Sequence, residues 1–518
     1  MKVDVDPANK NNLGFTNAWP INGQYTATIY IQGQPFQVQV DSGSSDLWVK
    51  VNSTNLPAYY GTGYNSSDSY AGGTHVDAQI MLANVSLGEF TVEEQAFLPV
   101  LDAGDSLDGG YTDGILGVGP ILGSPILLTL YNTSYQVNGL PLIFNIFGNY
   151  LDEQSFITIF LTREDFGITQ GGFLGISEIM AENASIIEAP KLPLTSNSSW
   201  STLMDGIYVN GEFLTGHSFG TNNSGLSVQP GVNQTVIGPD SGTTLISAPP
   251  YYVDAVYKGI PGAIFDEDQK TYQVPCETKL NVSMVFGETE YPMNPLDVIY
   301  PSFSNESAVC YGSMFYGRND TGVDFLLGDS FMMNVYTLFN YGYWIDSNRG
   351  APYIQMLSLT DRDQAWADFD FKNLIRLGNF AEQQIQQNEN ITSSYATAPP
   401  MTTTYPVVSA FPSGVPTPTA SAQSKLGAAL AESPASSGAS STDGLSGLQR
   451  NSYIIIGLVA GVLVLLLGVM IKLLSNSRSQ QYRAVPNIDR PPVHFSDKPY
   501  EAETEAFQTP YDDEERRT

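Results

Sequence analysis

Short apolar or alternating segments, separated by turns of Gly, Asn, Asp and Pro, dominate the chain upstream of residue 360. Segments of this kind predict β-strands, and the clearest ones cover residues 25–31, 36–40, 156–160, 207–209 and 335–339. Long amphipathic helical patterns are few. Residues 361–387 carry Trp, Phe, Leu and Ile at irregular helical spacing, which predicts only a short helical annex. The folded body is therefore expected to be all-β.

One apolar run stands apart from this pattern. Residues 453–471 contain no charge over 19 positions, and a helix of that length rises about 28 Å, close to the thickness of a bilayer core. Lys472, Arg478 and Arg483 follow the run, whereas Arg450 alone closely precedes it. The positive-inside rule therefore predicts a single transmembrane helix with a cytosolic C-terminus.

The segment before this run has the composition of a stalk. Ser, Thr and Pro make up 27 of the 59 residues in 391–449, too polar a stretch to bury a core. Twelve N-x-[ST] sequons precede the run and none follows it, as a lumenal or extracellular body requires. They lie at Asn52, Asn65, Asn84, Asn132, Asn183, Asn197, Asn222, Asn233, Asn281, Asn305, Asn319 and Asn390.

Charge and scarce residue types exclude several classes of function. The chain has 22 Lys and Arg against 53 Asp and Glu, a net charge of −31, so a nucleic-acid partner is not expected. With three histidines and two cysteines, no spacing suits a structural zinc site or a zinc protease, and no nucleophile motif accompanies a histidine. We therefore expect no metal and no cofactor, and carboxylates remain as the candidate catalytic groups.

A short acidic motif occurs twice. Asp41-Ser42-Gly43 and Asp240-Ser241-Gly242 lie about 200 residues apart, and each is followed by further hydroxyl residues. A carboxylate on a sharp glycine turn can be held by neighbouring hydroxyl and amide groups while its oxygens stay available for chemistry. Each copy is followed later by an apolar-apolar-Gly element, at residues 113–119 and 325–330. The chain is thus predicted to be an internal twofold repeat.

With these motifs the sequence resembles the pepsin-like aspartic proteases over roughly residues 14–357. The resemblance implies a bilobal β fold in which Asp41 and Asp240 are the catalytic pair, one from each lobe. It further implies that Tyr70 is the tyrosine of a β-hairpin flap over the substrate, with Trp48 as its partner. The residues to which it gives supporting roles are Ser42, Gly43, Ser44, Ser241, Gly242 and Thr243.

Within that resemblance, Ser44 and Thr243 match hydroxyls that hydrogen-bond the outer carboxylate oxygens. Ser42 and Ser241 stand where threonines more commonly tie the lobes together. Cys276 and Cys310, the only two cysteines, match a disulfide of the C-terminal lobe. The flap departs from the family pattern, because residues 75–78 read His-Val-Asp-Ala where a glycine is usual.

The predicted organisation has five parts: an N-terminal β lobe (14–190), a C-terminal β lobe (191–360), an annex and stalk (361–449), a transmembrane helix (453–473) and a cytosolic tail (474–518). Residues 1–12 contain no apolar signal region, so we expect either a longer precursor or a truncated start. Stalked, sequon-rich chains with a C-terminal anchor resemble fungal surface proteases. The plasma membrane is the first expectation for location, and a vacuolar or endosomal membrane the second.

The function implied by this resemblance is that of a monomeric aspartic endopeptidase. It would hydrolyse polypeptides at acidic pH with a water molecule activated between Asp41 and Asp240. The alternative is a catalytically inactive surface glycoprotein that uses the same scaffold for binding or adhesion. A turnover assay distinguishes the two.

Overall fold

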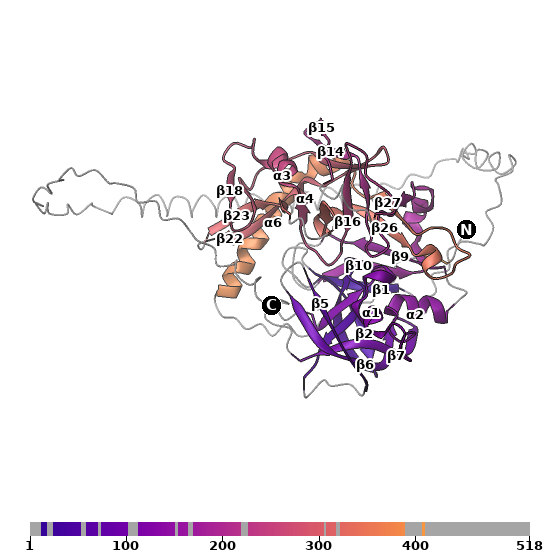
Figure 1. Cartoon of the computed structure of the whole chain (residues 1–518). Coiled ribbons are helices and arrows are strands. Elements are labelled where there is room, and N and C mark those ends of the chain that lie inside the picture. Colours follow the sequence, from indigo (N-terminus) through magenta and orange to yellow (C-terminus); the bar gives the residue numbers. More distant parts are fainter. Residues whose placement is uncertain are drawn as a thin grey trace, which may run out of the picture. The chain divides into compact units, whose positions relative to one another are not determined.

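The computed structural model of the chain (Figure 1) describes the greater part of its first compact unit, Met1–Gly414. The described residues are 12–17, 24–52, 59–70, 74–101, 112–150, 154–163, 169–218, 226–304, 307–317, 322–388 and 407–409. The domain boundaries given above stay predictions. The predicted transmembrane helix and cytosolic tail lie outside the described residues.

The largest sheet contains 13 strands and takes members from both halves of the chain. Its order is β12-β27-β26-β9-β10-β1-β2-β3-β8-β4-β7-β6-β5. In chain order the bounds are β1 Asn12–Asn17, β2 Tyr25–Ile31, β3 Gln34–Asp41, β4 Leu47–Lys50, β5 Tyr60–Ser69, β6 His75–Leu87, β7 Phe90–Val100, β8 Gly114–Gly117, β9 Phe156–Leu161, β10 Thr169–Ile176, β12 Leu192–Pro193, β26 Val335–Asn340 and β27 Tyr353–Ser358.

Three smaller sheets are built from the second half of the chain. The first contains β13 Thr202–Met204, β16 Thr235–Pro239, β25 Phe325–Leu327, β17 Ile246–Ala248 and β24 Met314–Tyr316. The second contains β15 Glu212–Leu214, β14 Gly206–Val209, β20 Val282–Phe286 and β21 Thr289–Pro292. The third contains β18 Ile264–Asp266, β19 Thr271–Val274, β23 Ser307–Gly312 and β22 Ile299–Ser304.

Helices are short, with one exception. The α-helices are α1 Pro125–Leu130, α2 Leu142–Asn149, α3 Pro250–Tyr257, α4 Pro295–Val298, α5 Asp329–Met332 and α6 Arg362–Asn388. The 3-10 helices are η1 Ile121–Gly123, η2 Ala181–Glu188 and η3 Gly342–Trp344. The described part of the chain is therefore mostly β, as predicted, and all five predicted strand segments are confirmed as β2, β3, β9, β14 and β26.

The two halves repeat the same strand topology. In the first half, β3 runs parallel to β8, and β8 pairs antiparallel with β4. In the second half, β16 runs parallel to β25, and β25 pairs antiparallel with β17. Asp41 ends β3 and Asp240 directly follows β16, so each acidic motif forms the loop between two strands that a third strand separates. The predicted internal repeat is confirmed at the level of topology.

The halves are joined by backbone pairing as well as by side chains. Strand β26 pairs antiparallel with β9, with Phe339 opposite Ile157. The Trp200 indole donates a hydrogen bond to the Val118 carbonyl (3.1 Å), and the Tyr341 hydroxyl donates to the same carbonyl (2.7 Å). All these side chains are buried. A continuous hydrogen-bonded sheet and buried side chains therefore connect the two halves of the chain, although the strands beside the second acidic loop belong to a separate sheet.

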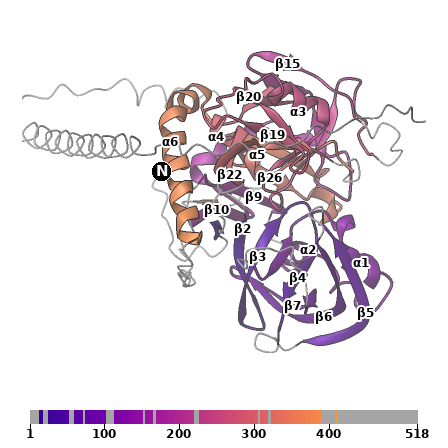
Figure 2. The same cartoon turned by 90° about the vertical axis from the view of Figure 1, so that its left-hand side faces the viewer.

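Helix α6 corrects the expectation of a short annex, because it runs for 27 residues (Figure 2). Its buried face is partly polar: the Arg376 guanidinium donates to the Leu296 and Ile299 carbonyls. Its outward face carries apolar side chains, with Phe371 and Leu374 each 70% exposed. Some apolar residues of the helix are thus exposed and some polar ones are buried, which is the reverse of the usual amphipathic pattern. This is why the sequence pattern predicted only a short helix.

The region predicted as a stalk contributes one further strand. Strand β28, Val407–Ser409, pairs antiparallel with β11, Glu178–Met180. Among the described residues, no helix is both long enough and apolar enough to cross a membrane.

The disulfide between Cys276 and Cys310 is confirmed, with Cα atoms 5.1 Å apart. Cys310 belongs to β23, which pairs with β19, the strand that ends two residues before Cys276. The bond therefore links the two central strands of the β18-β19-β23-β22 sheet, next to the end of β19.

Removing this disulfide by the double substitution Cys276→Ser/Cys310→Ser is expected to lower the free energy of unfolding by about 3–4 kcal/mol. Chain-entropy arithmetic gives this value for a loop of about 35 residues. Denaturant unfolding monitored by circular dichroism would measure it, with the reduced wild-type protein as a second comparison. Two thiols that react with an alkylating reagent in the native protein would contradict the bond.

Candidate active site

The two predicted catalytic aspartates lie on facing loops. Asp41 is 4% exposed and Asp240 is 6% exposed. A Cβ atom on Gly43 would lie 2.7 Å from Asp240 Oδ1, and one on Gly242 would lie 2.3 Å from Asp41 Oδ1. No side chain fits at either distance, so both glycines allow each carboxyl group to pack against the opposite loop. The sequence elements about 200 residues apart thus meet at one point.

The hydrogen bonds around the carboxyl groups follow the same twofold pattern. Gly43 N–H donates to Asp41 Oδ1 (2.8 Å) and the Ser44 hydroxyl donates to Asp41 Oδ2 (2.5 Å). In the second loop, Gly242 N–H donates to Asp240 Oδ1 (2.8 Å) and the Thr243 hydroxyl donates to Asp240 Oδ2 (2.7 Å). Four donors therefore fix the orientation of both carboxyl groups, and all of them belong to predicted supporting residues.

Ser42 and Ser241 connect the loops to each other. The Ser42 hydroxyl donates to the Pro239 carbonyl (3.1 Å) and accepts from Ser241 N–H (3.0 Å). Reciprocally, the Ser241 hydroxyl donates to the Val40 carbonyl (2.8 Å) and accepts from Ser42 N–H (3.2 Å). Both serines are buried, so these bonds are shielded from water and hold the two loops in register.

Burial and like charge raise the pKa of Asp41 well above its usual value of 3.8. Removal from water is the larger cause, and the negative charge of Asp240 is the next. The donors Ser44 and Gly43 act in the opposite direction, because they stabilise the ionised form. Two carboxyl groups in direct interaction cannot both ionise readily, so the pair retains one proton under acidic conditions.

Substituting Ser44→Ala is expected to move the alkaline limb of the kcat/KM profile toward higher pH, because Asp41, whose pKa is already raised, is the member of the pair that holds the shared proton. The substitution removes a hydrogen bond that lowers the pKa of Asp41 by stabilising its ionised form, so the variant should retain the shared proton to a higher pH than the wild type. Peptide cleavage measured across the acidic range tests this. The exposed Ser198→Ala is the control, and an unshifted limb would contradict the assignment.

The predicted flap pair is also brought together. Tyr70 follows β5, and its hydroxyl accepts a hydrogen bond from Trp48 Nε1 (2.8 Å). Trp48 is fully buried in β4, only seven residues after Asp41. Burial and the nearby charges of Asp68, Asp41 and Asp46 raise the pKa of Tyr70 well above its usual value, so its phenol remains protonated.

Two further carboxyl groups near this site had no predicted role. Asp46 is 2% exposed; its carboxyl accepts from the Ser124 hydroxyl and from Ile126 N–H (2.8 Å), and burial raises its pKa to about 7. Asp329 is fully buried, and its pKa is raised by burial and by the charges of Asp240 and Asp41. Asp46 follows the first acidic motif and Asp329 lies within the 325–330 element, but only their burial distinguishes them from surface acids.

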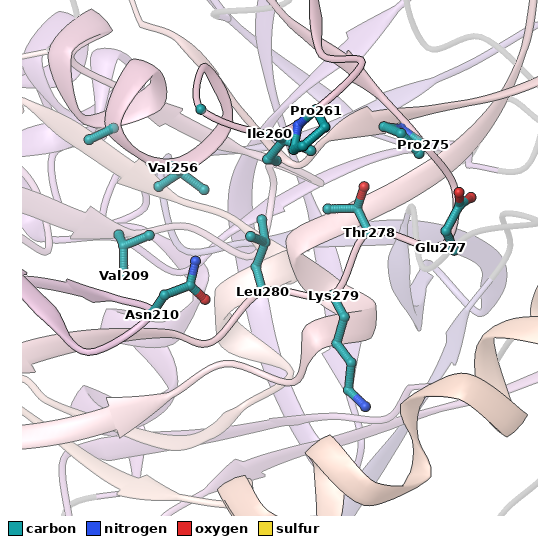
Figure 3. Close-up of a pocket in the computed structure, with 12 residues that line it drawn as sticks. Val209, Asn210, Val256, Ile260, Pro261, Pro275, Glu277, Thr278, Lys279 and Leu280 are labelled. Carbon is teal, nitrogen blue, oxygen red and sulfur yellow. The ribbon is translucent and has the colours of Figure 1, made fainter.

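Elsewhere in the second half of the chain lies a pocket of about 480 Å³ (Figure 3). Figure 3 shows Val256, Ile260 and Leu280 bordering it, while Lys279 extends away toward a helix. This helix is α6, since Lys279 Nζ lies 3.5 Å from Asp370. None of the predicted site residues lines the pocket. Within the described ranges, no three His, Cys, Asp or Glu side chains are grouped as a metal site would require.

The family model of the eukaryotic aspartyl proteases matches residues 24–344, which include both acidic loops. The chain therefore belongs to the eukaryotic aspartyl protease family, and it is an aspartic-type peptidase.

Similar proteins carry names of the same kind. An aspartic protease of Phaffia rhodozyma is 26% identical over 61% of this chain and 74% of its own length. A probable aspartic-type endopeptidase of Aspergillus fumigatus is 27% identical over 61% of this chain and 76% of its own length. Mouse cathepsin E is 27% identical over 62% of this chain and 78% of its own length.

Proposed function

We propose that the protein is an endopeptidase that hydrolyses polypeptides at acidic pH with a water molecule activated between Asp41 and Asp240. One observation carries the proposal: two buried carboxyl groups, each held by an amide and a hydroxyl donor, pack against each other's loops. Such a pair can hold one proton and one negative charge at the same time. It therefore offers a base and an acid at a single point.

The reaction follows from that shared proton. The ionised carboxylate removes a proton from the water as the water attacks the scissile carbonyl carbon, while the protonated carboxyl group donates to the carbonyl oxygen. The product of this step is a tetrahedral gem-diol, and no covalent bond to the enzyme forms. Proton transfer to the amine nitrogen then breaks the C–N bond and restores the carboxyl pair. The hydroxyl donors Ser44 and Thr243 keep the carboxyl groups oriented throughout.

The flap tyrosine has a positioning role in this proposal. Tyr70 is held by Trp48 at the end of the strand that precedes the hairpin turn. A peptide lying under the hairpin would be shielded from bulk water and aligned with the carboxyl pair. The expected partner is a polypeptide substrate bound by a monomer.

We further propose a location that rests on sequence alone. The apolar run 453–471, the stalk and the one-sided sequons favour a glycosylated, single-pass protein with its catalytic body outside the plasma membrane, or inside a vacuole or endosome. Endoglycosidase treatment of the full-length protein should increase its mobility. A tag after Thr518 that is accessible on intact cells would overturn this topology.

The decisive test of the activity is cleavage of a random peptide library by the purified full-length protein between about pH 3 and pH 7. We expect cleavage at the acidic end, blocked by a statine-type peptide whose hydroxyl imitates the gem-diol. If the protein binds such peptides but cleaves none, the binding or adhesion alternative replaces the proposal.

A further inference from the structure

The Tyr70 hydroxyl has a second partner beside Trp48, the carboxyl group of Asp68. Its oxygen lies 2.8 Å from Trp48 Nε1 and 3.3 Å from Asp68 Oδ2. An indole N–H can only donate, so the tyrosine oxygen accepts from Trp48 and its own hydrogen is directed to Asp68. An ionised carboxylate can only accept, so while Asp68 is ionised the direction of both bonds is fixed and Asp68 determines where the phenol hydrogen points.

Asp68 is itself held in place within β5. Its Oδ1 accepts from Ser69 N–H (2.8 Å), and the side chain is half-buried. Burial raises its pKa, while the Ser69 and Tyr70 bonds and the nearby His75 lower it. Asp46 faces it from the loop before β4. Helix α1, which packs on β5 (Figure 2), carries no titratable side chain.

The facing strand of the hairpin contributes His75, at one of the positions where the sequence departs from its family. Ser69 lies opposite His75 in the β5–β6 pairing, and the Ser69 hydroxyl and His75 Nδ1 are 2.9 Å apart. The residues directly after β5 and directly before β6 are also joined, because Tyr70 N–H donates a hydrogen bond to the Thr74 carbonyl (2.8 Å). A side-chain pair and a backbone hydrogen bond therefore join the ends of β5 and β6 beside Tyr70.

We propose that Asp68 is a positioning residue of the catalytic site, which orients the Tyr70 hydroxyl by accepting its hydrogen bond. The proposal rests on the proposed function, because it concerns how that site holds its substrate. Asp68 acts through Tyr70 and does not touch the reacting atoms. It gives this chain a flap tyrosine whose orientation depends on a carboxyl group two residues away.

This arrangement makes the orientation of Tyr70 sensitive to pH. Ionised Asp68 is a stronger acceptor than the neutral acid, so the bond to Tyr70 weakens as pH falls through the pKa of Asp68. Because burial raises that pKa, the bond weakens at a higher pH than it would for a carboxyl group in water. An asparagine at this position would imitate the neutral acid at every pH.

A double-mutant cycle tests the proposal. Asp68→Ala is expected to lower kcat/KM about tenfold in the wild-type background, the effect of losing one charge-assisted hydrogen bond. In a Tyr70→Phe background, which lacks the phenol hydrogen, the same substitution should change kcat/KM less than twofold. Asp68→Asn should match wild type at the lowest pH and fall below it as pH rises. The matched control is Asp77→Asn, an exposed carboxyl group on the facing strand.

The affinity for a statine-type peptide, measured by calorimetry, provides a second readout that needs no turnover. It should weaken about tenfold with Asp68→Ala in the wild-type background and remain unchanged in the Tyr70→Phe background. Equal losses in both backgrounds, or no loss in either, would overturn the proposal even if the wild-type protein cleaves peptides. A wild-type protein that binds the peptide without cleaving it would overturn the endopeptidase assignment alone. Circular dichroism establishes that each variant is folded, with Asp68→Asn as the milder substitution.

Discussion

Replacing either Asp41 or Asp240 by asparagine is expected to lower kcat/KM for peptide cleavage about a thousandfold or more. An amide can neither remove a proton from water nor share one with the opposite carboxyl group, and acid–base catalysis contributes up to about 10⁴-fold. The fold should remain intact, because an asparagine oxygen can still accept from Gly43 or Gly242 N–H, each 2.8 Å from its aspartate. Both positions should matter equally, since the two loops are equivalent in topology and hydrogen bonding.

The measurement is kcat/KM of purified variants with a peptide identified from the library, together with thermal unfolding. Asp268→Asn, a change of an exposed aspartate, should leave both unaffected. Wild-type activity should also fall as pH rises, because ionisation of both carboxyl groups removes the acid that polarises the carbonyl. Retention of more than about a tenth of the activity by either variant would contradict the assignment of the pair.

The protein is expected to lose several kcal/mol of folding stability between about pH 4 and pH 7. A carboxyl group whose pKa is higher in the folded state binds more protons there than in the unfolded chain, so stability falls as pH rises through this window. The shift of Asp46 from its usual 3.8 to about 7 corresponds to about 4 kcal/mol at 1.4 kcal/mol per unit. Asp329, fully buried with its pKa also raised, acts in the same direction.

Denaturant unfolding at pH 4 and pH 7 measures this loss. Asp46→Asn should unfold with nearly wild-type stability at pH 4 and be about 2–4 kcal/mol more stable than wild type at pH 7. The amide suits the site, because its oxygen can accept from Ile126 N–H and its nitrogen can donate to the Ser124 hydroxyl, both partners of the present carboxyl group. If the free energy of unfolding changed equally with pH in the variant and the wild type, Asp46 would ionise freely in the folded state and the prediction would be wrong.

The sequence predicted the centre of the molecule well because that centre is built from local, repeated patterns. Asp41 and Asp240 lie within identical tripeptides, and the strands leading to them alternate or are apolar throughout. A turn motif of this kind depends on residues within three positions, so its chemistry is visible without the tertiary structure. The Tyr70–Trp48 contact could be anticipated only through the resemblance to a family, since nothing local joins the two residues.

Other features depend on burial, which the pattern of residue types does not reveal. Asp329 and Asp46 look like ordinary turn acids in the sequence, yet both are enclosed. Asp68 is one of many acids in a chain with net charge −31, and only its 3.3 Å contact with Tyr70 singles it out. The length of helix α6 was underestimated because an arginine in a sequence pattern is taken as a solvent-exposed residue. In the structure Arg376 is buried and donates to two backbone carbonyls.

Helix α6 determines where the chain can be shortened. The family match ends at residue 344, but Phe369 and Phe380 on α6 are 1% and 3% exposed, and Asn373 donates to the Cys276 carbonyl (2.8 Å). A fragment ended at the family boundary would uncover this apolar surface and leave the Leu296 and Ile299 carbonyls without their guanidinium donor. A recombinant catalytic fragment must therefore retain α6 through at least Phe380, and a protease that cuts within 362–380 is expected to inactivate the enzyme by destabilising its second half.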